Sequence, residues 1–311
     1  MLRASLLWLS EQPRIFRFVR KSRLARRMAS RFVAGETIDS AMLALRDLNA
    51  ARISASLDLL GESVTRAEEA RAARDVYLQL LDRIHAAGAL ANVSVKLTQM
   101  GLDIDEALCL ENMRAILTRA RQYASFVRID MEGSAYTQRT LDFFSRVYPE
   151  FGNAVGVVLQ SYLRRTAADV DAVIALGARV RLCKGAYKEP PDVAFPDKRA
   201  VDANYVTCME RLLAKGNYPG LATHDEKIIT HARAFAKGAG IEPSRYEFQM
   251  LYGVRRDLQH ELRAAGYGMR VYIPFGTHWY PYLMRRLAER PANIGFVLGN
   301  LVREQLHGGR R

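Results

Sequence analysis

The pattern of hydrophobic and polar positions changes its period at about residue 90. Before this point, apolar residues recur at helical spacing over residues 36–50 and 62–88, as at Val76, Leu80 and Ile84. After it, short apolar and β-branched runs alternate with helical segments, which predicts repeated strand–helix units. The predicted strands are Val93–Leu97, Phe126–Met131, Val155–Leu159, Val180–Cys183, Gly220–Thr223, Tyr246–Met250, Val271–Pro274 and Ile294–Leu298. The predicted helices between them cover 104–122, 135–147, 166–176, 199–215, 225–237, 257–265 and 277–289.

The number and spacing of these units predict an α/β fold, a (β/α)8 TIM-type barrel. The strand candidates begin 22–40 residues apart, the length that a strand, a helix and two short loops need. Eight units match the size of a barrel, but a doubly wound sheet gives the same alternation and is the alternative. We expect an amino-terminal helical arm over residues 1–90 and the barrel domain over residues 91–311.

The charge of the chain changes this picture mainly at the amino terminus. The net charge over 311 residues is +13, and residues 1–31 contribute +8 of it through nine basic residues and one acid. Bulky side chains such as Trp8, Phe16 and Phe32 lie among the arginines, a pattern typical of a segment on an anionic membrane surface. The alternatives are a helix packed on its own domain and a transit peptide.

Polar residues stand at or just after nearly every strand candidate. They are Lys96, Asp130 with Glu132, Gln160, Arg181 with Lys184, Thr223 with His224 and Asp225, Gln249, and Tyr272. Because such barrels carry their chemistry at the carboxyl ends of the strands, we expect one cationic mouth suited to an anionic ligand or cofactor. Each residue alone has a simpler interpretation, since Asp130 or Asp225 can merely cap the following helix.

The predicted helix 277–289 carries a second group of candidate side chains. Tyr282, Arg285, Arg286 and Glu289 are spaced three or four residues apart and therefore share one broad face. The two arginines can converge on one carboxylate with their forked donors. The alternative is a surface arginine pair held by Glu289.

Several other chemistries lack their residue patterns. The cysteines Cys109, Cys183 and Cys208 show no paired spacing, which indicates neither disulfides nor a zinc site and fits a reducing compartment. The six histidines show no metal-ligand spacing, so we expect no metal. The chain contains no P-loop, no dinucleotide fingerprint after a strand and no nucleophile elbow.

Ordered stretches over about residues 90–300 resemble the proline dehydrogenase family. They are Ser94-Val-Lys-Leu97, Arg128-Ile-Asp-Met-Glu-Gly-Ser134, Val158-Leu-Gln-Ser-Tyr162, Val180-Arg-Leu-Cys-Lys-Gly-Ala-Tyr187, Ala222-Thr-His-Asp225, Phe248-Gln-Met-Leu-Tyr-Gly253, Val271-Tyr-Ile-Pro-Phe-Gly-Thr-His278 and Tyr282-Leu-Met-Arg-Arg-Leu-Ala-Glu289. The resemblance implies the barrel rather than the doubly wound sheet, and an FAD-dependent enzyme. Since the chain shows no aldehyde dehydrogenase or DNA-binding extension, it resembles the monofunctional bacterial type.

The resemblance also implies residues for L-proline. Asp130 and Arg181 would be the catalytic residues, Asp130 beside the substrate and holding Lys96 in place, and Arg181 close to flavin N5. The substrate-binding residues would be Lys96, Arg285 and Arg286 for the carboxylate, and Tyr187, Leu251, Tyr272 and Tyr282 near the ring.

A further set of residues would hold FAD. By the same resemblance they are Met131, Gln160, Arg181, Lys184, Gly185, Ala186, Thr223, His224 and Glu289. The implied reaction is hydride transfer from L-proline to flavin N5, giving Δ1-pyrroline-5-carboxylate, the first step of proline catabolism to glutamate. Electrons would then pass to a membrane quinone. This implies a cytoplasmic protein that contacts the inner face of the cytoplasmic membrane through residues 1–33.

Two other functions are alternatives. Another flavin barrel, such as a methylenetetrahydrofolate reductase-like protein, would not call for Arg285 and Arg286 with Tyr272 at this spacing. The basic composition suggests a nucleic-acid-binding protein, but the charge is concentrated in one arm and no binding motif is recognisable. We therefore expect no nucleic acid partner.

Overall fold

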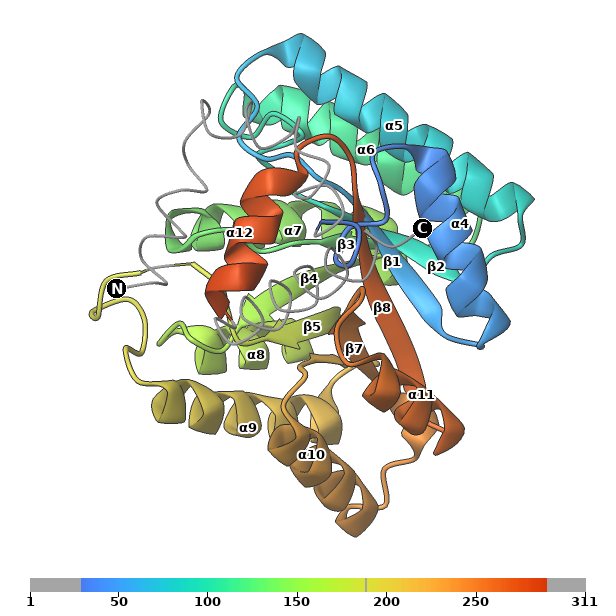
Figure 1. The fold of residues 1–311 in the computed structure, drawn as a ribbon. Helices are drawn as coiled ribbons and strands as arrows, with labels where there is room; N and C mark the ends of the chain where they lie inside the picture. The colour runs from blue at the N-terminus through green and yellow to red at the C-terminus, as the bar shows by residue number, and fades with distance from the viewer. Residues whose placement is uncertain (1–28, 188, 290–311) are drawn as a thin grey trace, which may run out of the picture.

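The computed structural model describes residues 29–187 and 189–289, which form a closed barrel of eight parallel strands surrounded by helices (Figure 1). The strands are β1 (Ser54–Leu59), β2 (Ala91–Val95), β3 (Val127–Ile129), β4 (Val155–Gln160), β5 (Arg179–Cys183), β6 (Gly220–Ala222), β7 (Glu247–Leu251) and β8 (Gly268–Phe275). The helices are α4 (Ile38–Ala50), α5 (Ala67–Ala86), α6 (Glu106–Gln122), α7 (Ser134–Phe151), α8 (Thr166–Ala175), α9 (Lys198–Lys215), α10 (Glu226–Gly238), α11 (Arg256–Ala264) and α12 (Trp279–Glu289). Each strand pairs with the next, and β8 closes on β1. The predicted (β/α)8 fold is confirmed.

The barrel begins earlier in the chain than the sequence pattern predicted. Strand β1 lies inside the segment 1–90 that we expected to be a helical arm, so the boundary at residue 90 is wrong. The first predicted strand is in fact β2. The physical reason is that Ser56 and Asp58 alternate with apolar residues, so β1 lacks the continuous apolar run that marked the other strands. The strand predicted at Ile294–Leu298 lies outside the described residues.

Helix α4 completes the outer layer although it precedes β1. It packs against both β8 and β1 and therefore covers the seam where the barrel closes. Its first turn carries a capping box in which Thr37 and Ser40 satisfy each other's backbone N–H groups. Helix α12, which follows β8, instead contributes side chains to a cavity at the carboxyl ends of the strands.

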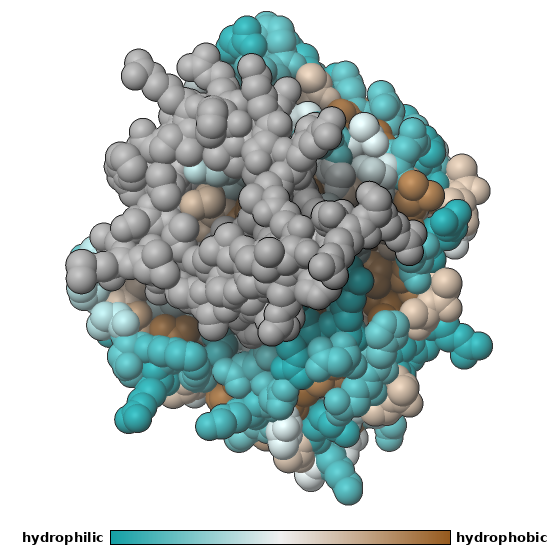
Figure 2. Space-filling model, in the orientation of Figure 1, coloured by the Kyte–Doolittle hydropathy of each residue, from teal (hydrophilic) through white to brown (hydrophobic). Residues whose placement is uncertain are grey.

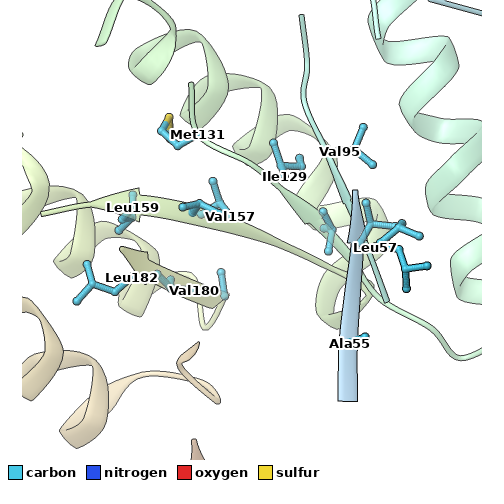
Figure 3. Packing of buried hydrophobic residues seen from close by; sticks show 14 of the residues in the cluster. Ala55, Leu57, Val95, Ile129, Met131, Val157, Leu159, Val180 and Leu182 are labelled. Carbon is cyan, nitrogen blue, oxygen red and sulfur yellow. The ribbon is translucent and has the colours of Figure 1, made fainter. Parts of the chain in front are cut away.

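The strands present different chemistry to their two sides. One set of alternate positions, including Leu57, Val157 and Leu182, is fully buried in the hydrophobic core (Figure 3). The intervening positions point into the barrel, where Arg181 of β5 reaches Ser56 of β1 on the opposite wall at 3.1 Å. Barrels of this class usually fill their interior with branched apolar side chains. Here hydrogen-bonded polar side chains occupy much of that space.

The chain that leads into α4 is attached to the end of β8. The backbone N–H of Ala34 donates to the carbonyl of Pro274 at 2.9 Å, and that of Gly276 donates to the carbonyl of Gly35 at 3.0 Å. Phe32 is buried as well. The described end of the basic amino-terminal segment therefore packs on its own domain, whereas residues 1–28 lie outside the described residues.

The described surface seen in Figure 2 is mainly hydrophilic, with hydrophobic residues in small separate areas. Exposed large apolar side chains such as Leu43 of α4 and Leu90 in the loop before β2 lie on different segments. No described helix is long and apolar enough to cross a membrane. In the same part of the chain, no three His, Cys, Asp or Glu side chains are grouped to hold a metal ion.

Candidate active site

A cavity of about 1480 Å³ opens at the carboxyl ends of the strands. It is lined by every residue that we assigned to substrate or cofactor except Glu289, whose side chain lies outside the described part of the structure. These residues are Lys96, Asp130, Met131, Gln160, Arg181, Lys184, Gly185, Ala186, Tyr187, Thr223, His224, Leu251, Tyr272, Tyr282, Arg285 and Arg286. The structure thus brings the predicted residues to one mouth, while the role of each stays a prediction. Since small-molecule pockets usually measure about 300–1,000 Å³, this cavity has room for a large cofactor and a small substrate together.

Lys96 is held by a carboxylate that the sequence analysis missed. Its Nζ lies 2.8 Å from Oδ1 of Asp58, and both side chains are buried. We expected Asp130 to hold Lys96, and this is wrong, because Asp58 stands beside Lys96 at the end of the adjacent strand β1. Burial would lower the pKa of Lys96, but Asp58 and Asp130 outweigh it and raise that pKa well above its usual value. The two carboxylates therefore favour the charged form of Lys96.

Arg181 is the centre of the polar network inside the barrel. Its Nη1 lies 2.8 Å from Oδ1 of Asp130, and its Nε donates to Oε1 of Gln249 at 2.6 Å. It also donates to the hydroxyls of Ser94 at 3.2 Å and Ser56 at 3.1 Å. These partners come from β1, β2, β7 and the end of β3, so closure of the barrel is what assembles the network. Gly220 leaves room for the side chain of Gln249 in this network, because a Cβ at this position would lie 2.3 Å from Nε2 of Gln249.

Asp130 connects this network to an aromatic side chain. The hydroxyl of Tyr272 donates to Oδ2 of Asp130 at 2.7 Å, and the guanidinium of Arg181 lies 5.2 Å from the centre of the Tyr272 ring. Burial, together with the charge of Asp130, raises the pKa of Tyr272 well above its usual value. The phenol therefore stays protonated. Asp130 does not cap the following helix, whose N-cap residue is Gly133, so the simpler interpretation of Asp130 is wrong.

Arg285 of α12 is engaged by a second carboxylate that the sequence analysis missed. Its Nη1 lies 2.6 Å from Oε1 of Glu62, in the loop between β1 and α5. Burial would raise the pKa of Glu62, but Arg285 and Lys96 outweigh it and lower that pKa. This ion pair joins the loop after β1 to α12. It also shows that Arg285 can be held by a residue other than Glu289.

Two aromatic side chains complete this part of the mouth. The guanidinium of Arg286 lies 5.2 Å from the centre of the Tyr282 ring, within cation–π distance. Tyr187 lines the same cavity, and burial together with the nearby carboxylate of Glu62 raises its pKa, which keeps the phenol neutral. Cations, the carboxylates of Asp58 and Asp130, and flat rings thus line the cavity around Lys96.

The other part of the cavity is built from the ends of β5 and β6. Nζ of Lys184 lies 2.6 Å from Asp202 and 2.9 Å from Asp225. Asp225 also accepts from the backbone N–H of Lys227 and so caps α10, which confirms the predicted cap, but it does more than cap because it lines the cavity and binds Lys184. Nε2 of His224 accepts from the backbone N–H of Leu251 at 3.0 Å, which orients the imidazole ring at the end of β7.

Gly185 determines the path of the chain at this end. Its φ angle is +102°, in the region that favours glycine. A Cβ at this position would also lie 2.2 Å from the ring of Tyr162, so a larger residue would have to displace that ring. Gly185 therefore lets the strand β5 turn sharply into the loop that carries Ala186 and Tyr187.

Glu132 turns away from the cavity, contrary to the prediction that it joins the mouth. It accepts from the hydroxyl of Thr98 at 2.5 Å and from the backbone N–H of Thr98 at 3.2 Å. The hydroxyl of Thr98 in turn accepts from the backbone N–H of Ser63, next to Glu62. Burial raises the pKa of Glu132 to about 7. Glu132 thus braces the loop that carries Glu62 rather than lining the site.

Known proteins are similar to this chain in sequence. A family model described as proline dehydrogenase matches residues 41–298. The chain is 41% identical over 307 residues to "Proline dehydrogenase" of Deinococcus radiodurans, covering 97% of this chain and 98% of that protein. It is 41% identical over 304 residues to "Proline dehydrogenase 1" of Bacillus subtilis strain 168, covering 98% of this chain and 100% of that protein.

Solved structures of larger proteins are similar as well. Proline utilization A from Bdellovibrio bacteriovorus, inactivated by N-propargylglycine, superposes with a TM-score of 0.81 at 27% identity, over 89% of this chain and 34% of that one. This chain therefore spans about a third of the length of that protein. With a family model over most of the sequence, two relatives at 41% identity over nearly the whole length and the barrel itself in agreement, the chain belongs to the proline dehydrogenase family.

Proposed function

We propose that this chain oxidises L-proline to Δ1-pyrroline-5-carboxylate with FAD as the hydride acceptor, the first step of proline catabolism to glutamate. The observation that carries the proposal is the mouth where Lys96, Arg285 and Arg286 meet the rings of Tyr272 and Tyr282. Such a site matches a small ring that bears a carboxylate. The names of the similar proteins support the same substrate.

The substrate end of the mouth offers charge and shape together. Forked guanidinium donors suit a carboxylate, and Lys96 adds a buried point charge beside them. In the structure Arg285 forms an ion pair with Glu62, so a substrate carboxylate would have to replace Glu62 as the partner of Arg285. Flat tyrosine rings would contact the CH groups of the pyrrolidine ring. Clamping a small substrate in this way fixes its reacting carbon and nitrogen, which is a large part of catalysis by proximity.

The remaining part of the cavity fits FAD. Oε1 of Gln160 is buried without a hydrogen-bond partner among the described residues, so it is an acceptor suited to an N–H on the edge of a flavin ring. Further along, Lys184, Thr223 and His224 lie near the amino end of α10, whose helix dipole favours the charge of a pyrophosphate. Gly185 and Ala186 keep that wall narrow, and Met131 adds an apolar contact. The polar and apolar groups of this part of the cavity therefore suit a dinucleotide whose ring system carries hydrogen-bonding groups.

The protein's own contribution to the reaction is positioning and electrostatics. When bound, FAD would supply a two-electron acceptor for the hydride that leaves the proline carbon next to nitrogen. Arg181 is fixed by four side chains, so its positive charge is preorganised inside the barrel and needs no rearrangement. Asp130 orients Arg181 and Tyr272 together through its two carboxylate oxygens.

We propose further that electrons leave the enzyme for a membrane quinone, and that the protein works in the cytoplasm at the inner face of the cytoplasmic membrane. The support is the net charge of +8 over residues 1–31, which would attract anionic lipid headgroups. Co-sedimentation of the whole chain with vesicles of anionic and of neutral lipid tests this, and equal binding to both would contradict it.

The experiment that tests the activity is a visible spectrum of the purified protein before and after L-proline under anaerobic conditions. We expect flavin absorbance that bleaches with L-proline. In Arg285→Met the flavin should stay bound, while KM for proline rises about 10- to 100-fold, the effect of losing a charged hydrogen bond of about 1.5–3 kcal/mol. The matched control is Arg211→Met on the outside of α9, where Arg211 pairs with Asp171. A colourless protein that takes up no FAD would contradict the proposal.

A further inference from the structure

A second cavity, of about 480 Å³, lies at the opposite, amino-terminal end of the barrel strands. Five arginines line it: Arg52, Arg128, Arg179, Arg263 and Arg270. Among the described residues in its wall there is one carboxylate, that of Glu247. The cavity therefore has an excess of positive charge in a concave setting, where a field is focused most strongly.

The carboxylate of Glu247 is already neutralised. Nε of Arg270 lies 2.6 Å from one of its oxygens and Nη2 of Arg270 lies 3.1 Å from the other. Gln249 and Tyr218 donate to it as well, at 2.6 Å and 3.3 Å. Burial would raise the pKa of Glu247, but Arg270 outweighs it and lowers that pKa. Glu247 thus balances Arg270 and leaves the other arginines without a counter-charge.

Arg128 is the arginine of this cavity whose burial most needs a negative group nearby. It comes from β3, is 4% exposed, and its Nη1 donates to the carbonyls of Val157 at 3.1 Å and Arg179 at 2.7 Å. Its Nε is buried and has no hydrogen-bond partner among the described residues. A Cβ at Gly156 would lie 2.7 Å from its Nη1, so the glycine keeps this space open for the guanidinium. A buried cation with unused donors is costly unless a negative group meets it.

Arg179 is arranged in the same way. Its guanidinium lies 5.4 Å from the ring of Phe126 and 5.2 Å from the ring of Tyr218, while Arg128 lies 4.6 Å from the same Phe126. Stacking on rings leaves the N–H donors at the edge of a guanidinium available. Nε of Arg179 is buried and unpartnered within the described structure. Two guanidinium groups are thus held on one aromatic ring with donors to spare.

The two outer arginines add charge at the rim. Nε of Arg263 donates to the carbonyl of Arg52 at 2.8 Å. Within residues 29–187 and 189–289, neither of them forms an ion pair, and neither do Arg128 and Arg179. Four cations around one cavity therefore lack a described counter-charge.

We propose that this amino-terminal cavity binds a phosphate-type oxyanion with at least two negative charges, either free or as the phosphate group of a small metabolite. Forked guanidinium donors suit phosphate oxygens, and several cations around one cavity attract an anion with two negative charges more strongly than one with a single charge. A volume of about 480 Å³ falls within the range of small-molecule sites, about 300–1,000 Å³, so there is room for an organic group beyond the phosphate. The site is distinct from the candidate active site, because it opens at the other end of the same strands.

The test is calorimetric titration of the whole purified protein with inorganic phosphate and, separately, with phenyl phosphate, the ionic strength being held constant with NaCl. We expect saturable binding of one anion per chain. Arg179→Gln should weaken it at least tenfold, and Arg263→Gln, on helix α11, provides a second variant if the first does not fold. The matched control Arg211→Gln, an exposed arginine paired with Asp171, should bind as the wild type does.

The outcomes separate the possible sites and sources. Binding lost in Lys184→Met but kept in Arg179→Gln would place the anion in the larger cavity and overturn the proposal, as would the absence of saturable binding. Equal weakening in Arg179→Gln and Arg211→Gln would show general charge attraction and overturn it too. If the proposal holds, similar affinities for both probes indicate free phosphate, and tighter binding of phenyl phosphate indicates a phosphorylated metabolite.

Discussion

The two ends of the barrel treat positive charge in opposite ways. At the carboxyl ends of the strands, buried or half-buried cations have carboxylates at 2.8 Å or less; the pairs are Lys96–Asp58, Arg181–Asp130 and Arg285–Glu62. At the amino ends, one pair, Arg270–Glu247, stands beside four arginines that have no described counter-charge. At the first end each of these cations is balanced by its own carboxylate, and under the proposed function a substrate carboxylate would displace Glu62 from Arg285. The amino ends carry an excess of positive charge, which would be balanced by the anion that we propose.

The two ends are joined by a continuous row of polar side chains through the barrel. Arg270 binds Glu247, Glu247 accepts from Gln249, and Gln249 accepts from Arg181. Arg181 in turn binds Asp130 at the candidate active site. The two ends therefore belong to one hydrogen-bonded network, and variants that remove one carboxylate at a time test how far each end depends on its pairs.

The largest effect is expected for Glu247→Ala at the amino end. This change leaves Arg270 buried without its partner and removes an acceptor of Gln249, so the free energy of unfolding should fall by about 3–5 kcal/mol. Urea unfolding measures it. The matched control is Glu150→Ala, whose partner Arg114 lies 3.0 Å away on the surface and for which a loss of about 1 kcal/mol or less is expected. Equal losses would show that the pair in the barrel is no more important than a surface pair.

The next effect concerns Glu132, a carboxylate near the carboxyl end that is held by Thr98 rather than by a cation. Its pKa of about 7 in the folded protein lies above the usual 4.5, so the folded state binds this proton more tightly than the unfolded chain does. Its contribution to stability is therefore complete below about pH 4.5 and is lost as the pH rises to about 7, a change on the order of 3 kcal/mol.

Glu132→Gln removes this titration and keeps an acceptor for Thr98. Urea unfolding of both proteins between about pH 5 and about pH 8 should show wild-type stability falling relative to the variant as the pH rises. If the free energies of unfolding of the two proteins change with pH in parallel, the pKa of Glu132 is not raised in the folded protein.

The sequence predicted the helices and the mouth better than the individual contacts. The helices predicted at 166–176 and 199–215 correspond to Thr166–Ala175 and Lys198–Lys215, because an amphipathic period and a capping residue such as Asp197 are local properties. The sequence also predicts which residues stand at the carboxyl ends of strands, because this depends only on where each strand ends along the chain. The parallel barrel brings them together whatever the exact register.

What could not be predicted depends on closure of the barrel. Strand β1 was missed because its interior face is polar, and with it went Asp58 and Glu62, the partners of Lys96 and Arg285. An alternating run such as Ser54–Leu59 is the signal that could have revealed it. The convergence of Arg128 and Arg179 at the amino end is likewise a consequence of how strands far apart in the sequence are staggered around the barrel.

The smallest of these effects is expected for Asp130→Asn, which sharpens the comparison at the carboxyl end. Asparagine is similar in shape but carries no charge, so Arg181 loses its ion pair and Tyr272 keeps only a weaker acceptor. We expect kcat/KM for L-proline to fall about 100-fold, equivalent to about 2.7 kcal/mol of transition-state stabilisation. The control is Asp103→Asn, since Asp103 also binds one tyrosine and one arginine, Tyr136 at 2.6 Å and Arg139 at 2.8 Å, but near the surface. It should change kcat/KM less than about twofold. Similar losses in the two variants would mean that the carboxylate between Arg181 and Tyr272 supports the fold and not the reaction.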